Sequence, residues 1–160
     1  MCHSHNEEAE LGIMTWYKHT QIGYLLLTLY SIVVLLLGYL NIMMNFHPLT
    51  LISLIIVLIA LGTFSRLTVT VDDQMIKIQF GLKIIRKAFA LKEIEACRVV
   101  KNPWYYGWGI RFTPRGWLYN VSGFSAIELQ MKHGKHYRIG TDDPDNLAEA
   151  LEKALHTESQ

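Results

Sequence analysis

One long stretch of the sequence carries no formally charged side chain, and it constrains the fold more than any other feature. No Asp, Glu, Lys or Arg occurs between Lys18 and Arg66. A lipid hydrocarbon core about 30 Å thick requires roughly 20 apolar residues per helix. The stretch therefore has room for two membrane-spanning helices, which we predict at about residues 20–40 and 48–65, joined by the turn "NIMMNFH".

A helical hairpin buried in a water-soluble core is the alternative interpretation. Such helices would carry a polar stripe along one side, and residues 22–40 and 48–64 have none. A cleaved signal peptide does not fit either, because the apolar run starts late and a second span follows it. We therefore assign residues 16–65 to a two-helix transmembrane hairpin and residues 1–15 to a flexible polar tail.

The cationic residues beside the spans predict their orientation. Lys18 precedes the first span and Arg66 ends the second, whereas the turn between the spans has no Lys or Arg. Positive residues gather on the cytoplasmic side of a membrane. We expect a multi-pass protein of the inner (plasma) membrane with both termini in the cytoplasm, and we interpret Trp16, Tyr17 and Lys18 as an anchor at headgroup level.

The apolar period changes from helical to two after Arg66. The segments "LTVTV" and "MIKIQF", at residues 67–71 and 75–80, flank "DDQ" and predict a β-hairpin. Further strands are predicted at residues 83–89, 94–100, 109–113, 117–121, 126–132 and 136–140, and their alternation points Phe112 inward and Glu128 outward. Seven or eight short strands at this spacing predict an antiparallel sandwich or barrel with one buried and one solvated face.

The last segment predicts one amphipathic helix at residues 144–156. Asp143 stands at the N-cap position with Pro144 at the first helical position. Leu147, Leu151 and Leu155 recur every fourth residue and form a narrow apolar stripe. We expect this helix to lie across the open end of the barrel.

The order of two spans, a run of strands and one terminal helix resembles the membrane-anchored bacterial proteins that carry a pleckstrin-homology-like (PH-like) domain. The phrases that carry the resemblance are "VDDQMIKIQFG", "NPWYYGWGIR" to "WLYNVSG", and "KHGKHYRIGTDDPD" with the helix that follows. The resemblance implies a membrane α-helical hairpin (two TM helices) plus a mostly-β PH-like barrel with one C-terminal helix, at residues 66–157. It implies no activity, because the subfamily is uncharacterised.

Catalytic signatures are missing from the sequence. It has no GxSxG, HExxH, Walker or dinucleotide-binding motif, and its serines, histidines and carboxylates are scattered. We therefore predict a non-enzymatic protein with no catalytic residues and no cofactor. The net charge of +1 without an extended basic stripe argues against a nucleic-acid partner.

Two segments contain metal-ligand residue types. "TDDPD" is rich in carboxylates, but acidic residues at a helix start are explained by capping, so we assign no metal site there. Cys2, His3 and His5 lie beside the N-terminal amine, and this donor set suits Cu, Ni or Zn ions. A metal-binding tail is kept as an alternative function.

The stretch "NPWYYGWGIR" is the candidate binding site. Strand alternation allows about half of its aromatic side chains to face a barrel core. The others must contact the terminal helix, the bilayer interface or a protein partner, all places that suit Tyr and Trp. The candidate partner or lipid patch consists of Trp104, Tyr105, Tyr106, Trp108, Arg111 and Arg115.

These observations predict a membrane-anchored scaffold whose PH-like domain binds a membrane-protein partner or a second copy of itself. The alternative is an anionic-lipid-interacting module at the inner leaflet. Inositol-lipid binding is disfavoured, because the first hairpin turn carries Asp72 and Asp73, which repel phosphate. Other cations, including Lys83, Arg86 and Lys87, remain available to anionic lipid or are simply the wet positions of the strands.

Overall fold

The computed structural model describes residues 14–158, which form two β-sheets and three α-helices. The four-stranded sheet has the order β1-β2-β3-β4, and the five-stranded sheet has the order β5-β8-β9-β7-β6. The strands of the first sheet are β1 (Thr15–Ile22), β2 (Arg66–Asp72), β3 (Met75–Phe80) and β4 (Arg86–Ala90). Those of the second are β5 (Ile94–Lys101), β6 (Gly109–Thr113), β7 (Gly116–Asn120), β8 (Ser125–Met131) and β9 (His136–Gly140). The helices are α1 (Tyr24–Met43), α2 (Pro48–Phe64) and α3 (Pro144–Glu158), with short 3₁₀ turns η2 (Leu91–Glu93) and η3 (Trp104–Tyr106).

The predicted strands after residue 66 are confirmed, except that β4 begins at Arg86 rather than at residue 83. They form two open sheets rather than a closed barrel. The hairpin of β2 and β3 has the predicted antiparallel register, with Val69 opposite Ile78. One ladder differs from an all-antiparallel arrangement, because β7 and β9 run parallel. No ladder joins the two sheets among residues 14–158, so β4 and β6 are both sheet edges.

The first strand is the main correction to the sequence interpretation. Residues Trp16 to Lys18, which we interpreted as an anchor at headgroup level, lie in β1, and α1 begins only at Tyr24. β1 pairs with β2 in antiparallel register from Thr15 opposite Asp72 to Ile22 opposite Arg66. The helical hairpin of α1 and α2 is therefore inserted between two paired strands of the same sheet.

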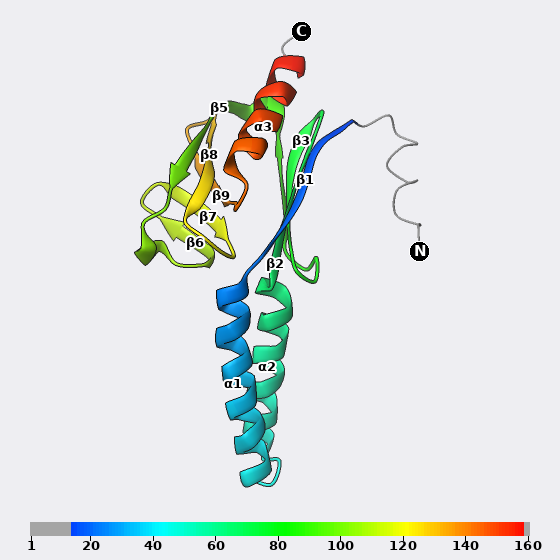
Figure 1. Cartoon of the computed structure of the whole chain (residues 1–160), viewed down its shortest axis with the longest axis vertical. Coiled ribbons are helices and arrows are strands. Elements are labelled where there is room, and N and C mark those ends of the chain that lie inside the picture. Colours follow the sequence, from blue (N-terminus) through cyan, green and yellow to red (C-terminus); the bar gives the residue numbers. More distant parts are fainter. Residues whose placement is uncertain (1–13, 159–160) are drawn as a thin grey trace.

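The core lies between the two sheets and is closed on one side by α3. Alternate residues of β2, β3 and β8 point into it, as their period of two predicts. Phe89 of β4 contacts the rings of Tyr119 and Tyr137 across the core, with ring centroids 6.4 and 4.5 Å away. α3 packs against β1 and β5, with Leu147 and Leu151 fully buried. Figure 1 shows this helix lying between the two sheets.

The helical hairpin projects from one end of the two-sheet domain (Figure 1). α1 has the length and apolar composition of a helix that can cross a membrane, and Asn41 is its one buried residue. α2 is equally apolar but has 17 residues. Near the tip, Asn41 joins the helices: its amide nitrogen donates to the Thr50 carbonyl oxygen (3.1 Å), and the Thr50 hydroxyl donates to its Oδ1 (2.9 Å).

The base of the helical hairpin is tightly packed against the domain at glycines. The Gly23 amide donates to the Ser65 carbonyl oxygen (2.9 Å), and a Cβ on Gly23 would lie 2.8 Å from the Val121 carbonyl oxygen. A Cβ on Gly81 would overlap the Gly62 carbonyl oxygen and lie 2.7 Å from that of Thr63. The end of α2 therefore rests directly on the β3–β4 connection, without room for a side chain.

We predict that Gly81→Ala destabilises the junction by about 1–3 kcal/mol, because the new methyl group meets backbone atoms that cannot rotate away. The measurement is the thermal unfolding midpoint of the detergent-solubilised chain, followed by near-ultraviolet circular dichroism. Gly38→Ala is the matched control, since nothing lies within 4 Å of its added Cβ. Equal midpoints for the two variants would contradict the described packing.

Candidate functional site

The aromatic segment, residues 102–108, connects β5 to β6 and crosses the outer face of the five-stranded sheet. The neighbours of Arg138, Tyr137 and Ile139, point into the core, so Arg138 points to the outer face. Its Nη1 donates to Asn102 Oδ1 (3.0 Å), and its guanidinium carbon lies 5.9 Å from the centre of the Tyr106 ring. The segment therefore covers the sheet face that the alternation of side chains would otherwise expose to solvent.

A buried carboxylate organises this covered face. Glu128 accepts hydrogen bonds from Arg138 Nε through Oε2 (2.7 Å) and from Arg98 Nε through Oε1 (2.9 Å). Glu128 and Arg138 are both 2% exposed. Burial raises the pKa of the Glu128 carboxyl, but the hydrogen bonds and charges of Arg98 and Arg138 outweigh burial and hold its pKa below the ordinary value.

Glu128 and Arg138 form a buried ion pair that the sequence pattern did not predict. We expected Glu128 at an outward, solvated position of its strand, and the structure buries it. The ladder between β8 and β9 places Arg138 opposite Glu128. The only signal in the sequence is this opposite charge at alternating positions of two neighbouring strands, which becomes informative once the register is known.

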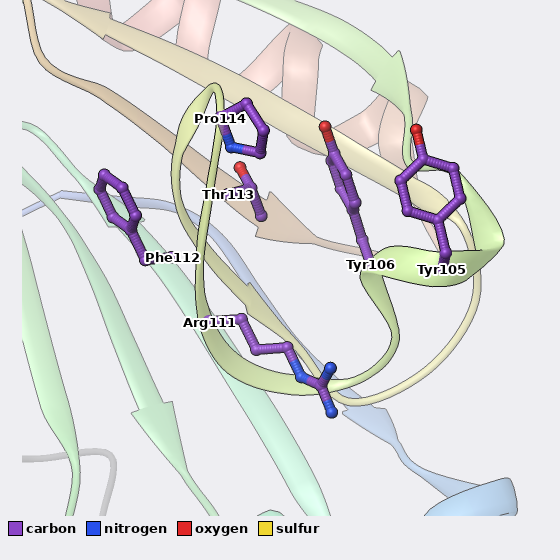
Figure 2. Close-up of a pocket in the computed structure, with 6 residues that line it drawn as sticks. All are labelled: Tyr105, Tyr106, Arg111, Phe112, Thr113 and Pro114. Atoms are coloured by element: carbon purple, nitrogen blue, oxygen red, sulfur yellow. The ribbon is translucent and has the colours of Figure 1, made fainter.

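Three of the six predicted patch residues, Tyr105, Tyr106 and Arg111, lie together in one pocket. Trp104 and Tyr105 are 78% and 64% exposed, and Tyr106 and Trp108 are half-buried. Tyr105, Tyr106 and Arg111 line a pocket of about 300 Å³ with Phe112, Thr113 and Pro114 (Figure 2). We call these six residues the β6 surface.

The other three predicted residues lie outside this pocket. The Trp104 ring stands edge-on to Tyr105, with centroids 6.1 Å apart, and so extends the β6 surface. Trp108 turns toward Phe124, with centroids 6.3 Å apart. Arg115 lines a second pocket of about 320 Å³, whose other residues are Phe112, Pro114, Gly116, Trp117, Gly134, Lys135, His136 and Tyr137.

Phe112 lines both pockets, and its exposure corrects a second expectation. We predicted Phe112 inward on the alternation of its strand, but it is 72% exposed and packs edge-on against Trp117, with centroids 5.6 Å apart. The reason is its place at the sheet edge. Phe89 of the opposite sheet reaches Tyr119 on β7, and β6 lies one strand further out.

The two pockets are lined by aromatic and basic side chains. Neither is lined by a carboxylate, and the first combines aromatic rings with one guanidinium group. Within residues 14–158, no group of three or more His, Cys, Asp or Glu side chains is placed to hold a metal ion. The predicted tail ligands Cys2, His3 and His5 lie outside the described residues.

Comparison of the chain with protein-family models, curated proteins and solved structures found no match. The resemblance to PH-like membrane proteins therefore stays a prediction, and the function has to be argued from the site.

We predict that Glu128→Gln destabilises the chain by about 3–5 kcal/mol at pH 7, because it leaves buried Arg138 without its counter-charge. A carboxyl with a lowered pKa in the folded state stabilises at neutral pH, and this contribution is lost as the pH falls through that lowered pKa. The variant should therefore lose less stability than the native chain below pH 4.5, the ordinary pKa of Glu.

The measurement is urea unfolding of the solubilised chain at several pH values. The matched control is Glu149→Gln on α3, because Glu149 is also paired, with Lys153, but its side chain is 63% exposed. A loss as small as the control's would show that the Glu128 network is not what holds the aromatic segment to the sheet.

Proposed function

We propose that this chain is a non-enzymatic, membrane-anchored interaction module. α1 and α2 lie in the bilayer, and the two-sheet domain with its terminal helix, in a PH-like arrangement, stands at the membrane surface. The β6 surface binds a protein partner there. The observation that carries the proposal is the exposed, aromatic and carboxylate-free β6 surface, on a domain whose charge-free helical hairpin projects away from it.

The dimensions of the helical hairpin support its place in a bilayer. At 1.5 Å per residue, α1 and α2 are about 30 and 26 Å long, close to the roughly 30 Å of a hydrocarbon core. Two hydroxyl groups of α2 are satisfied within the helix: Ser53 donates to the Thr50 carbonyl oxygen and Thr63 to that of Ile59 (both 2.8 Å). This internal pairing is what a lipid environment requires.

The distribution of cations supports a cytoplasmic domain. Arg66, Lys83 and Arg86 lie at the base of the helical hairpin, whereas its tip, residues 44–47, has no Lys or Arg. By the positive-inside rule, the base is cytoplasmic. The proposed location is therefore the inner (plasma) membrane with the domain and both termini inside.

The β6 surface supports a protein partner because of its composition and its place at a sheet edge. Within the described part of the chain, β6 pairs only with β7, so its other side offers unpaired backbone groups. Exposed Trp, Tyr and Arg side chains are the types that contribute most to protein interfaces. Figure 2 shows Tyr105 and Tyr106 side by side on one side of the β6–β7 ribbon and Phe112 on the other.

We expect a photo-crosslinking amino acid at Tyr105 or Phe112, in the full chain in its native membrane, to capture one discrete protein. The matched control position is His133 in the β8–β9 turn, which is exposed but lies outside both pockets. A Phe112→Ser change in the chain crosslinked from Tyr105 should remove the product while leaving the unfolding midpoint unchanged.

The identity of the crosslinked species distinguishes a protein partner from contact with lipid. A heterologous protein or a second copy of this chain supports the proposal and identifies the partner. Crosslinks confined to lipid, or equal yields at Tyr105 and His133, would contradict a protein-binding role for the β6 surface.

A further inference from the structure

We infer that residues 81–85, the loop between β3 and β4, insert into the headgroup region of the bilayer that holds the helical hairpin. In this arrangement Leu82 and Ile84 reach the acyl boundary, and Lys83 and Arg86 lie at the level of anionic lipid phosphates. The inference rests on the proposed membrane anchoring and adds a second contact between this chain and the membrane.

The first observation is the position of the loop at the base of the helical hairpin. β3 ends at Phe80 opposite Leu67, which is the second residue of β2 and the third residue after α2 ends. The Gly81 amide donates to the Arg66 carbonyl oxygen (2.9 Å). A Cβ on Gly62 of α2 would lie 2.9 Å from Leu82 Cδ1. Leu82 therefore touches α2 within its last turn, and whatever surrounds that turn also surrounds Leu82.

The second observation is the exposure of two aliphatic side chains in this loop. Leu82 and Ile84 are 58% and 65% exposed, whereas Ile85 packs against the core. The loop is held by its own hydrogen bonds: the Lys83 amide donates to the Phe80 carbonyl oxygen (2.6 Å), and the Phe80 amide donates to that of Ile85 (3.0 Å). The exposed side chains are thus presented by a fixed backbone.

The loop turns at Lys83, whose backbone conformation is unfavourable for a residue with a side chain. Lys83 has φ +59°, in the left-handed region that glycine adopts more readily. Its carbonyl oxygen accepts a hydrogen bond from Arg86 Nε (2.8 Å). This contact ties the Arg86 side chain to the loop and brings a second cation beside Lys83.

The third observation is the sign of the charge. From Gln74 to Lys92 the chain contains no Asp or Glu, while Lys83, Arg86 and Lys87 occur in and beside the loop. The carboxylate of Asp142 contacts β1 rather than the loop: its Oδ1 lies 2.7 Å from His19 Nε2. Each cation near an anionic leaflet contributes about 1 kcal/mol of attraction.

These observations favour lipid over a protein as the occupant. The exposed side chains of the loop continue the apolar surface of α2, and the cations lie where that surface meets the domain. This is the layered order of a membrane interface, with aliphatic groups inside and Lys or Arg at the phosphates. A loop that enters the bilayer beside the helical hairpin would also fix the tilt of the domain on the membrane.

The test uses the full chain in vesicles of mixed neutral and anionic phospholipid. In a background carrying Cys2→Ser and Cys97→Ser, single cysteines at Ile84, Leu35 and His133 are labelled with an environment-sensitive fluorophore. Lipids with a nitroxide near the headgroup, or deep in the acyl chain, serve as quenchers. Leu35 is mid-way along α1, and His133 is in the β8–β9 turn at the far end of the sheets.

We expect the label at Ile84 to be quenched by the shallow nitroxide, the label at Leu35 by the deep nitroxide, and the label at His133 by neither. Quenching at Leu35 without quenching at Ile84 would overturn the inference and leave the anchoring proposal standing. Absence of quenching at Leu35 would overturn the anchoring proposal and, with it, this inference.

A charge variant tests the second half of the inference. Adding Lys83→Glu to the Ile84 reporter should reduce shallow quenching in anionic vesicles, and more so than Lys132→Glu, a change in the same turn as His133. Equal quenching in the two variants would overturn the assignment of Lys83 to lipid phosphates. The unfolding midpoint of each labelled chain confirms that it is folded.

Discussion

The ladder between β1 and β2 is the constraint on which the rest of the structure depends. It holds residues 22 and 66, the two ends of the helical hairpin, at the separation of neighbouring strands, about 4.8 Å. Packed helix axes lie about 8–10 Å apart, so the two chain segments must separate between the strand ends and the first turns of the helices. Gly23 and Gly81 permit this narrow base, because a side chain at either position would meet backbone oxygen atoms.

The same ladder couples the helical hairpin to the domain. Because α1 and α2 continue directly from two hydrogen-bonded strands, the domain cannot move away from the helical hairpin as it could on a flexible linker. The Gln21 side chain adds a contact to the second sheet by donating to the Ser122 carbonyl oxygen (2.9 Å). The domain is therefore held at a fixed height above the proposed membrane surface, which places residues 81–85 at its interface.

Most of the fold after residue 66 was predictable, because alternation of apolar side chains is a local signal. Val69, Ile78 and Ile127 are buried as their strands require. β1 was not predictable in the same way. Its partner lies beyond the whole helical hairpin in sequence, and Trp16, Tyr17 and Lys18 beside an apolar run are also typical of a membrane anchor.

The candidate site was half predictable for a related reason. The composition of "NPWYYGWGIR" marks a surface rich in Tyr and Trp, and Tyr105, Tyr106 and Arg111 do meet in one pocket. The pairing of Glu128 with Arg138 and the exposure of Phe112 depend on which strands are neighbours and which strand is the edge. Those relations arise from sheet topology, for which these short segments carry no local signal.

The proposed function depends on two parts of the structure, the buried Glu128 network and the base of the helical hairpin. The buried Glu128 network holds the aromatic segment across the sheet, and this segment completes the wall of the β6 pocket through Tyr105 and Tyr106. The helical hairpin and the loop at its base then determine which way that pocket faces at the proposed membrane surface. Binding of a partner by the β6 surface would be oriented by the same packing that anchors the domain.

The most direct test of the account is a disulfide between Thr20→Cys and Thr68→Cys in a chain without its native cysteines. The two hydroxyl oxygens lie 2.8 Å apart across the β1–β2 ladder, so we expect rapid oxidation to a crosslink within one chain. Thr20→Cys with Gln79→Cys is the control, because Gln79 lies one strand further away. Failure of the first pair to crosslink within the chain, or equal crosslinking of both pairs, would mean that residues 15–22 do not belong to the sheet.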